Sequence, residues 1–431
     1  MFYYIDPYGC AKNQVDAENI MAALNRNGWE AGQPDNADLI IVNSCGFIES
    51  AKQESINAVL QWRKQYPGKK ILLAGCLSQR YENELKEILP EADLLYGNAD
   101  PGGIAKAAAA VVGLKGRRKT AGPAGLPGSR PLLSLPGSAY VKISEGCNNR
   151  CSYCAIPLIK GSLKSRGIAE IYGECKTLVG RGIRELCIIG QDICSYGPGL
   201  PELLESISGL KGNFWVRLLY MHPDNFEIPV LDIMKKDRRF LPYFDLPFQH
   251  GSEKILGLMN RRGNAETYLG LIKIIRQSFG DAVIRSTFLT GFPGETEEDF
   301  FALLDFQEKA SLDWAGCFAY SREEDTPSYS MKPQVPKKTA NARKKIIEER
   351  QIPITEKQMD RFIGRTFDIL VEEKIEGEEG LWLGRCPFQA PEVDGAAVIN
   401  SEAGLLPGDF MKGRIHARAG LDMEVSDFYL R

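Results

Sequence analysis

Short apolar runs alternate with stretches of helical periodicity along the first part of the chain. Each run precedes a helical stretch: 2–5 before 13–27, 38–42 before 49–65, and 70–74 before 80–89. Strands that alternate with helices predict a mostly parallel sheet. We therefore expect residues 1–112 to form an α/β domain.

The same alternation continues in the middle of the chain. Six further apolar runs are predicted strands, most of them followed by a helical stretch: 139–144, 185–189, 215–220, 243–246, 282–289 and 316–320. Six such units predict a partial parallel (β/α)6 barrel over residues 138–335. Catalytic residues of such barrels gather at the mouth formed by the carboxyl ends of the strands.

Two connecting segments and a third domain complete the predicted fold. Residues 113–137 are rich in Gly, Pro, Lys and Arg and predict a linker, while the charged segment 336–362, interrupted by Pro353, predicts a connecting helix. Residues 363–431 predict a small antiparallel β-barrel of the OB-like kind. Its five expected strands are 365–372, 380–385, 396–399, 410–417 and 424–429.

The composition is that of an ordinary soluble protein. Of the 431 residues, 25% are charged and 44% are hydrophobic, and the formal net charge of −3 argues against a protein that mainly covers nucleic acid with basic surface. No apolar run reaches the length of a membrane span and no signal-peptide pattern is present, so we expect a cytoplasmic protein without a membrane partner. The eleven cysteines are expected to be ligands and core thiols.

Three cysteines in one tight loop are the clearest chemical signal. Cys147, Cys151 and Cys154 are spaced C-x3-C-x2-C directly after the predicted strand at 139–144, in a loop rich in Asn and Gly. Core cysteines do not usually cluster on such loops. The pattern therefore predicts a metal site.

The missing fourth ligand indicates which kind of metal site this is. Structural zinc takes four protein ligands, but the only histidines are His222, His250 and His416, and the next cysteine is Cys175. Iron–sulfur clusters are normally held by four thiolates. Three thiolates would leave one iron open to a substrate or cofactor.

The loop resembles the signature of the radical S-adenosylmethionine (SAM) superfamily, in which an aromatic residue, here Tyr153, precedes the last cysteine. The resemblance implies a [4Fe-4S] cluster whose open iron is chelated by SAM. Reduction of that cluster then cleaves SAM to methionine and a 5′-deoxyadenosyl radical. In such enzymes the cofactors carry the chemistry and the protein positions them.

A second set of cysteines is predicted in the first domain. Cys10, Cys45 and Cys76 each follow a predicted parallel strand. Sites in parallel sheets form beyond the carboxyl ends of the strands, so the three thiols should meet there. The alternative is that each cysteine is a small apolar residue at the end of its strand. Because all three share the same position, and each has a glycine neighbour that permits close approach, we expect a second cluster.

Five residues past the ends of barrel strands are candidates for holding SAM, together with Tyr153. They follow the second, fourth and fifth predicted strands of the barrel: Gly190, Gln191, Asp192, His250 and Glu295. His250 is equally consistent with a hydrogen-bonded structural histidine. For Glu295, which is followed by two more glutamates, the interpretation we favour is helix capping.

The three domains together resemble the methylthiotransferases over nearly the whole chain, with a C-terminal TRAM barrel that usually binds RNA. Members of the MiaB type modify an adenosine of tRNA, and members of the RimO type modify an aspartate of ribosomal protein S-twelve. Four runs resemble the RimO type: G-C-A-K-N-Q-V-D at 9–16, C-A-I-P at 154–157, W-V-R-L-L-Y at 215–220 and A-P-E-V-D-G at 390–395.

The resemblance implies two [4Fe-4S] clusters, one that cleaves SAM and one that carries the sulfur. It implies methylthiolation of the aspartate β-carbon, an electron donor such as flavodoxin or ferredoxin, and an unidentified sulfur source. Residues 360–431 hold 8 Lys and Arg against 14 Asp and Glu, which suits a basic ribosomal protein better than RNA. A tRNA-modifying enzyme, a non-catalytic iron–sulfur carrier and an RNA-binding module are the alternatives.

Three positions depart from the family pattern. Lys160 and Lys164 stand where the family often has arginine, and lysine lacks the planar fork that binds an anion through two hydrogen bonds. Cys194 replaces a hydroxyl residue after the Gln-Asp pair, and we interpret it as a small core residue.

Overall fold

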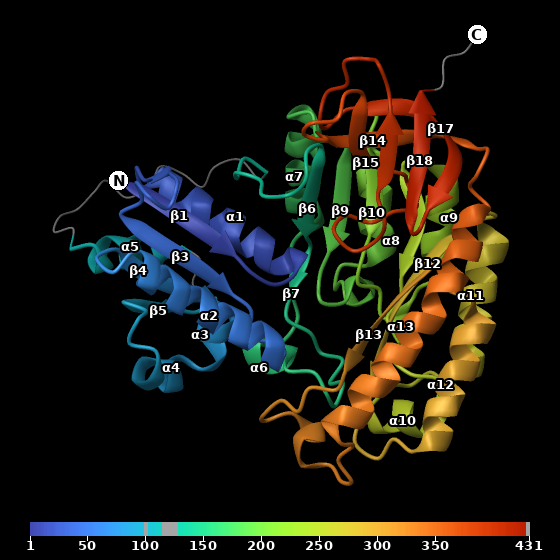
Figure 1. The fold of residues 1–431 in the computed structure, drawn as a ribbon, viewed down its shortest axis with the longest axis horizontal. Coiled ribbons are helices and arrows are strands. Elements are labelled where there is room, and N and C mark those ends of the chain that lie inside the picture. Colours follow the sequence, from blue (N-terminus) through green and yellow to red (C-terminus); the bar gives the residue numbers. More distant parts are fainter. Residues whose placement is uncertain (99–101, 114–127, 428–431) are drawn as a thin grey trace.

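The computed structural model describes residues 1–98, 102–113 and 128–427, which form three units (Figure 1). The first unit is a five-stranded parallel sheet in the order β2-β1-β3-β4-β5. Its strands are β1 (Phe2–Pro7), β2 (Glu30–Ala31), β3 (Leu39–Ser44), β4 (Lys70–Gly75) and β5 (Leu94–Tyr96). The parallel α/β prediction for this part of the chain is confirmed.

Helices cover both faces of this sheet because alternate strand residues are apolar on both sides. Leu39, Ile41 and Leu72 pack under α1 (Ala11–Arg26) and α5 (Ile104–Val111). Ile40 and Val42 pack under helices of the opposite face. Those helices are α2 (Glu49–Gln65), α3 (Cys76–Arg80) and α4 (Glu82–Ile88). The helix expected at 80–89 is thus two short helices that meet at Tyr81.

The second unit is a six-stranded parallel sheet in the order β13-β12-β11-β10-β9-β6, the open barrel expected from the sequence. The strands are β6 (Ser138–Lys142), β9 (Glu185–Ile189), β10 (Trp215–Leu218), β11 (Phe240–Asp245), β12 (Val283–Thr290) and β13 (Trp314–Ala319). A small hairpin, β7 (Ser144–Glu145) with β8 (Lys164–Ser165), frames the cysteine loop.

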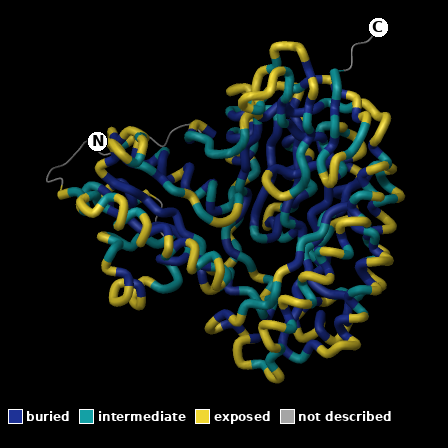
Figure 2. The backbone as a smooth tube through the Cα atoms, in the orientation of Figure 1, coloured by how far each residue is buried: buried dark blue, intermediate teal, exposed yellow. Residues whose placement is uncertain are grey.

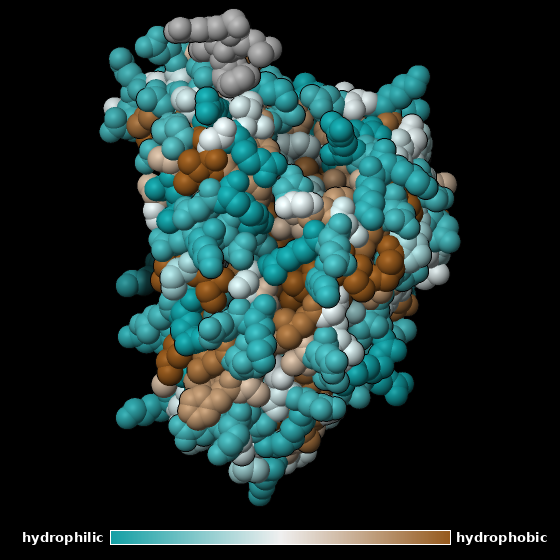
Figure 3. Space-filling view, turned by 90° about the vertical axis from the view of Figure 1, so that its right-hand side faces the viewer, coloured by the Kyte–Doolittle hydropathy of each residue, from teal (hydrophilic) through white to brown (hydrophobic). Residues whose placement is uncertain are grey.

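One face of the second sheet is covered by helices. They are α7 (Ile168–Gly180), α8 (Leu200–Ser208), α9 (Pro229–Lys236), α11 (Ala265–Ser278) and α12 (Glu297–Ala310), with the short α6 (Ile156–Lys160) and α10 (Glu253–Leu258) at the strand ends. Figure 3 shows the face on the right-hand side of Figure 1 to be largely hydrophilic, with scattered apolar patches. Buried backbone is concentrated in the sheets (Figure 2).

The third unit is a closed barrel in the order β14-β15-β16-β18-β17. Its strands are β14 (Thr366–Lys374), β15 (Leu381–Arg385), β16 (Ala397–Asn400), β17 (Phe410–Ala419) and β18 (Asp422–Asp427). All neighbouring pairs are antiparallel except β16 and β18, which run parallel. The expected small OB-like barrel is confirmed.

This C-terminal barrel packs against the face of the second sheet that the helices leave free, which we call the inner face. On β9, Leu186 and Ile188 point to the helices, whereas Cys187 and Ile189 belong to one hydrophobic cluster with the core of the C-terminal barrel. Tyr243 also reaches that cluster, and its hydroxyl donates a hydrogen bond to Asp394 at 2.6 Å. The inner face is therefore closed by protein.

Buried ions join the C-terminal barrel to the second sheet. Glu185 accepts from Arg217 Nε at 2.8 Å and from Arg385 Nη2 at 2.5 Å, and Arg385 also pairs with Glu372. Ser138 accepts from Arg385 at 2.8 Å. These residues come from β6, β9, β10, β14 and β15. The network therefore fixes the position of the C-terminal barrel relative to the second sheet.

The helix α13 (Lys337–Asp360) differs from the expected interrupted connector. It continues through Pro353 and packs on β12, β13 and α12. Gln351 donates to the carbonyl of Leu312 at 2.9 Å, and Ile347 is fully buried. Tertiary contacts on both sides of Pro353 thus outweigh the hydrogen bond that proline cannot make.

The first unit rests on the carboxyl-end side of the second sheet. α1 contacts β6, and α3 contacts α6. Lys52 and Arg80 both pair with Glu323, at 3.1 and 2.7 Å. The linker predicted at 113–137 lies largely outside the described residues, including its basic cluster at 116–119. No helix in the described ranges could span a membrane.

Candidate active site

Cys10, Cys45 and Cys76 follow β1, β3 and β4, at one edge of the first sheet. The approach is close: a Cβ atom built on Gly9 would lie 3.0 Å from Cβ of Cys45, and one on Gly46 would lie 2.8 Å from the carbonyl oxygen of Cys76. Larger residues than glycine would push these segments apart. The structure therefore brings the three predicted cysteines together.

Asn13 fastens the same three segments. Its Nδ2 donates to the carbonyls of Tyr8, Asn43 and Ser44, at 2.5, 3.2 and 3.2 Å, and the Cys76 thiol lies 3.8 Å from its Oδ1. Asn43 donates back to the Asn13 carbonyl at 2.8 Å. Sequence reasoning named this residue only as part of a motif; its role depends on contacts between distant segments.

Cys147, Cys151 and Cys154 lie on the loop that follows β7. Gly146 has φ +75°, and a side chain there would collide with the carbonyls of Gly161 and Ser162, so glycine is required at this turn. The Cys154 amide donates to the Cys151 carbonyl at 3.0 Å. The loop thus curls its three thiols around one space.

Burial makes these thiols reluctant to ionise without a cation. It raises the pKa of Cys45 and Cys147, and it raises the pKa of Cys76 and Cys154 to about 12. A bound metal deprotonates a coordinating thiol outright. Both sets therefore have the donor chemistry of a metal centre.

The thiol donors of each set are the ligand type that iron–sulfur clusters take. Within the described ranges, no three Cys, His, Asp or Glu side chains converge closely enough to hold one metal ion. An iron–sulfur cluster places each thiolate on a different iron, so its ligands stand further apart than those of one ion. A four-iron cluster held by three thiolates has one iron without a protein ligand.

The Gly190–Asp192 turn lies against the cysteine loop. Asp192 accepts from Asn149 at 2.8 Å and from Asn225 at 2.7 Å, and Gln191 donates to Glu145 at 2.7 Å. A Cβ on Gly190 would lie 2.8 Å from Oγ of Ser144. All three predicted residues of this turn thus border the loop, and Asp192 chiefly holds it in place.

Arg261 is a neighbour of the loop that sequence reasoning missed. Its guanidinium is 7% exposed and donates from Nη2 to the hydroxyl of Tyr153 at 2.9 Å. Its Nε and Nη1 are buried without a hydrogen-bond partner, and no carboxylate within the described residues pairs with it. A buried cation with free donors requires an anion, which the carboxylate of SAM would provide.

His222 also approaches the cysteine loop, with Nε2 3.9 Å from Sγ of Cys151. Burial and the nearby Arg261 lower the pKa of His222 to about 4, so the ring is neutral at physiological pH. Its Nδ1 accepts from the amide of Asp224 at 3.3 Å. The proton of a neutral ring then sits on Nε2, facing the thiol.

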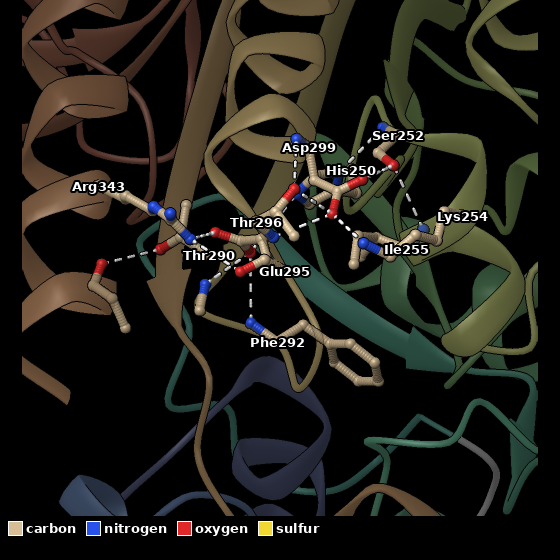
Figure 4. Close-up of polar contacts among 12 residues, drawn as sticks. His250, Ser252, Lys254, Ile255, Thr290, Phe292, Glu295, Thr296, Asp299 and Arg343 are labelled. Carbon is tan, nitrogen blue, oxygen red and sulfur yellow. Dashed lines mark hydrogen bonds and ion pairs between the residues drawn. The ribbon is translucent and has the colours of Figure 1, made fainter. Parts of the chain in front are cut away.

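His250 and Glu295 form a different network, between β12 and α13 (Figure 4). Glu295 accepts from the amides of Gly291 and Phe292, at 2.7 and 3.3 Å, and pairs with Arg343 at 2.5 Å. His250 Nδ1 accepts from the Ser252 amide at 2.9 Å, and its Nε2 lies 3.5 Å from Glu295.

The capping interpretation of Glu295 is not what the structure shows. Helix α12 is capped by Thr296 together with Asp299, so Glu295 lies outside the cap. Its carboxylate instead holds the turn after β12 and anchors α13.

Ion pairs connect the two cysteine sets. Asp16 of α1 pairs with Lys142 of β6 and, at 2.7 Å, with Lys160 of α6. Lys142 also pairs with Glu145 at 2.5 Å. Both lysines are largely buried, so the first unit is held on the barrel beside both sets of thiols.

Comparison with known proteins agrees with this architecture. Family models match at residues 2–97 ("Uncharacterized protein family UPF0004"), 141–306 ("Radical SAM superfamily") and 363–426 ("TRAM domain"). The chain is 49% identical to "Ribosomal protein uS12 methylthiotransferase RimO" of Treponema denticola, over 97% of this chain and 99% of that protein. The chain belongs to the RimO family of methylthiotransferases.

Other relatives of the same name support this assignment. RimO of Pelotomaculum thermopropionicum is 40% identical over 97% of each chain, and RimO of Aquifex aeolicus is 38% identical over 97% of this chain and 95% of that protein. The expected enzyme class is confirmed: the protein is a sulfur-transferring methylthiotransferase of the radical SAM superfamily, whose cofactors are SAM and [4Fe-4S] clusters.

Solved structures share the fold at low identity. The radical SAM methyltransferase TsrM from Kitasatospora setae, described with cobalamin and a [4Fe-4S] cluster bound, superposes with a TM-score of 0.58 at 15% identity and covers 76% of each chain. The cobalamin-dependent radical enzyme OxsB gives a TM-score of 0.52 at 11% identity, over 81% of this chain and 56% of that one. At these identities the likeness shows a shared fold and no more.

Proposed function

We propose that this RimO-family enzyme methylthiolates the β-carbon of an aspartate of ribosomal protein uS12. The observation that carries this proposal is 49% identity to a uS12 methylthiotransferase over nearly the full length of both chains. The excess of acidic residues at 360–431 also favours a basic protein over tRNA as the substrate.

The six cysteines would hold the two clusters. Cys147, Cys151 and Cys154 would bind the cluster that meets SAM, and Cys10, Cys45 and Cys76 would bind the cluster that carries sulfur. When bound, these cofactors supply a hydrogen-abstracting radical and the sulfur that is methylated and transferred. The thiols, the ion pairs of Asp16 and the bonds of Asn13 keep the two sets in fixed positions.

Residues around the first loop would orient SAM. Arg261 offers free donors to its carboxylate, Tyr153 positions Arg261, and Asp192 steadies the loop through Asn149 and Asn225. Gly190 and Gln191 border the same space. His250 and Glu295 lie side by side and each accepts hydrogen bonds from the backbone, so we assign them to the support of the barrel.

The C-terminal barrel and the first unit would exclude water from the reaction. The former closes the inner face of the sheet and the latter lies over its mouth. Keeping water and oxygen away protects a radical from side reactions. We also propose a cytoplasmic location, where the ribosome is, and an electron donor such as flavodoxin or ferredoxin.

Mass spectrometry of uS12 tests the substrate. The anaerobically reconstituted enzyme, with SAM and a reductant, should add a methylthio group to one aspartate of uS12 and leave tRNA unmodified. Modification of tRNA instead would overturn the assignment.

Iron analysis tests the two-cluster assignment, because two clusters require about eight irons for each chain and one requires about four. Replacing Cys10, Cys45 and Cys76 by Ala should leave SAM cleavage measurable and end sulfur insertion.

A further inference from the structure

Lys12 is a cation that follows Cys10 and faces the barrel. It lies in the first turn of α1, two residues after Cys10, and its side chain is half-buried. Its Nζ lies 3.1 Å from the centre of the Tyr220 ring. Tyr220 follows β10 at the mouth of the barrel. Lys12 thus reaches from the first unit into the space above the radical SAM barrel.

Lys12 differs from the other lysines at this interface. Lys52, Lys142 and Lys160 each form an ion pair with at least one carboxylate. Within the described ranges, no carboxylate lies within ion-pair distance of Lys12, and its Nζ lies over the face of the Tyr220 ring. A ring face attracts an ammonium less strongly than a carboxylate in a site shielded from water.

Asp245, at the end of β11 beside Tyr220, is already occupied by other partners. Asp245 pairs with Arg285 at 3.1 Å and accepts from the Tyr220 amide at 2.9 Å. Tyr220 itself has φ +65°, a conformation that is uncommon for a residue with a side chain and is found at functional sites. The backbone bond to Asp245 maintains that conformation, which presents the ring to Lys12.

We propose that Lys12 binds the side-chain carboxylate of the aspartate that receives the methylthio group. This inference rests on the proposed function. The β-carbon of aspartate is bonded directly to the carboxylate carbon, so a cation that holds the carboxylate also fixes the reacting carbon. At Lys12 that carbon would lie between the thiols that hold the radical-forming cluster and those that hold the sulfur-carrying cluster.

The same contact would give selectivity for aspartate. Asparagine has the same shape but no charge, so it loses the ion pair and leaves the ammonium without an anion. A site built around a buried charge rejects the uncharged analogue because its own group then stays unpaired.

Binding measurements test this without relying on turnover. The modified aspartate is first located by mass spectrometry, and uS12 and its Asp→Asn variant are then titrated into the full-length reconstituted enzyme by calorimetry. The unsubstituted enzyme should bind uS12 about tenfold to hundredfold more tightly than the variant. Lys12→Met and Lys12→Gln should bind both proteins with nearly equal, weak affinity, and Lys12→Arg should retain most of the preference.

Lys64→Met is the matched control, because Lys64 is an exposed lysine of α2 in the same unit. It should keep the full preference for aspartate. A preference that persists in both Lys12→Met and Lys12→Gln would overturn the inference.

A second readout separates the substrate from the cluster as the partner of Lys12. Electron paramagnetic resonance of the substrate-free enzyme should give the same signal for the cluster at Cys10 in Lys12→Gln as in the unsubstituted enzyme. A changed signal together with an unchanged Asp-over-Asn preference would mean that Lys12 serves the cluster. Absence of uS12 modification by the unsubstituted enzyme would instead reject the proposed function.

Discussion

The thiol of Cys76 lies 3.8 Å from Oδ1 of Asn13, which is 2% exposed and also binds the backbone after β1 and β3. One amide thus fastens all three cysteine-bearing segments. The proposed second metal centre would therefore depend on a residue that is not a ligand.

We predict that Asn13→Ala weakens this centre specifically. Removing the amide leaves buried carbonyls without donors, which should lower the free energy of unfolding by about 2 kcal/mol. The iron content should fall from about eight toward about four for each chain, measured after anaerobic reconstitution. Asn57→Ala, at an exposed position of α2, should change neither quantity. Full iron content in Asn13→Ala would contradict the prediction.

Asp16 is predicted to hold the first unit on the barrel. Burial by itself would raise its pKa, but Lys142 and Lys160 outweigh burial, and its pKa lies below the ordinary value. Asp16→Asn would leave two lysines without their shared partner and should lower the free energy of unfolding by about 3 kcal/mol at neutral pH.

The sign of the pH dependence follows from the lowered pKa. The carboxylate stabilises the folded state above its unfolded pKa of about 3.9, and the contribution is lost as pH falls through the lower folded value. Denaturant titrations should therefore show that the unsubstituted protein and Asp16→Asn differ less in free energy of unfolding at acid pH than at neutral pH. Asp305→Asn removes an exposed pair with Lys309 and should have little effect at any pH.

Glu295 is predicted to support the fold and not the cofactor. Glu295→Gln breaks the pair with Arg343 and should lower the free energy of unfolding by about 2 kcal/mol, while the Kd for SAM stays unchanged. Arg261→Gln, in contrast, should raise the Kd for SAM about tenfold to hundredfold. Glu297→Gln is an exposed control two residues away, in the first turn of α12. Weaker SAM binding by Glu295→Gln without a loss of stability would refute this division.

Glu185 is predicted to fasten the C-terminal barrel. Burial would raise its pKa, but Arg385 and Arg217 lower it to about 2. Glu185→Gln leaves two buried arginines short of an anion and should cost about 3 kcal/mol of unfolding free energy. The Glu185 carboxylate stabilises the folded state above its unfolded pKa of about 4.3, and this stabilisation is lost as pH falls toward the lower folded pKa. Equal stability of both proteins at neutral pH would contradict the role.

Much of the fold could be predicted because local patterns agree with tertiary structure. The strand at 185–189 was predicted with the bounds that β9 has, and the cysteines after β1, β3 and β4 could be placed together because parallel strands end at a common edge. The helix predicted at 336–362 is present as α13, but its continuation through Pro353 could not be predicted, because its packing on β13 is invisible in local sequence.

The rest of the site depends on contacts between distant parts of the chain. Lys160 pairs with Asp16 across 144 positions, and Arg261 meets Tyr153 across 108. The sequence does not mark Arg261 as unusual, since arginines are common at surfaces, and the departure at Lys160 does not identify Asp16 as its partner. Glu295 was misjudged for a similar reason: its acidic neighbours resemble a helix start, but its own partner, Arg343, comes from another helix.

Because the C-terminal barrel contacts the inner face of the second sheet, residues 363–427 also shield that face from solvent. A shortened enzyme that ended after α13 would lay Trp215, Tyr243 and Trp314 bare and would open the base of the reaction chamber to solvent. Such a protein would tend to self-associate and to quench its own radical chemistry. A C-terminal barrel of this kind is usually regarded as a binding domain. In this molecule it would also enclose the space in which the reaction takes place.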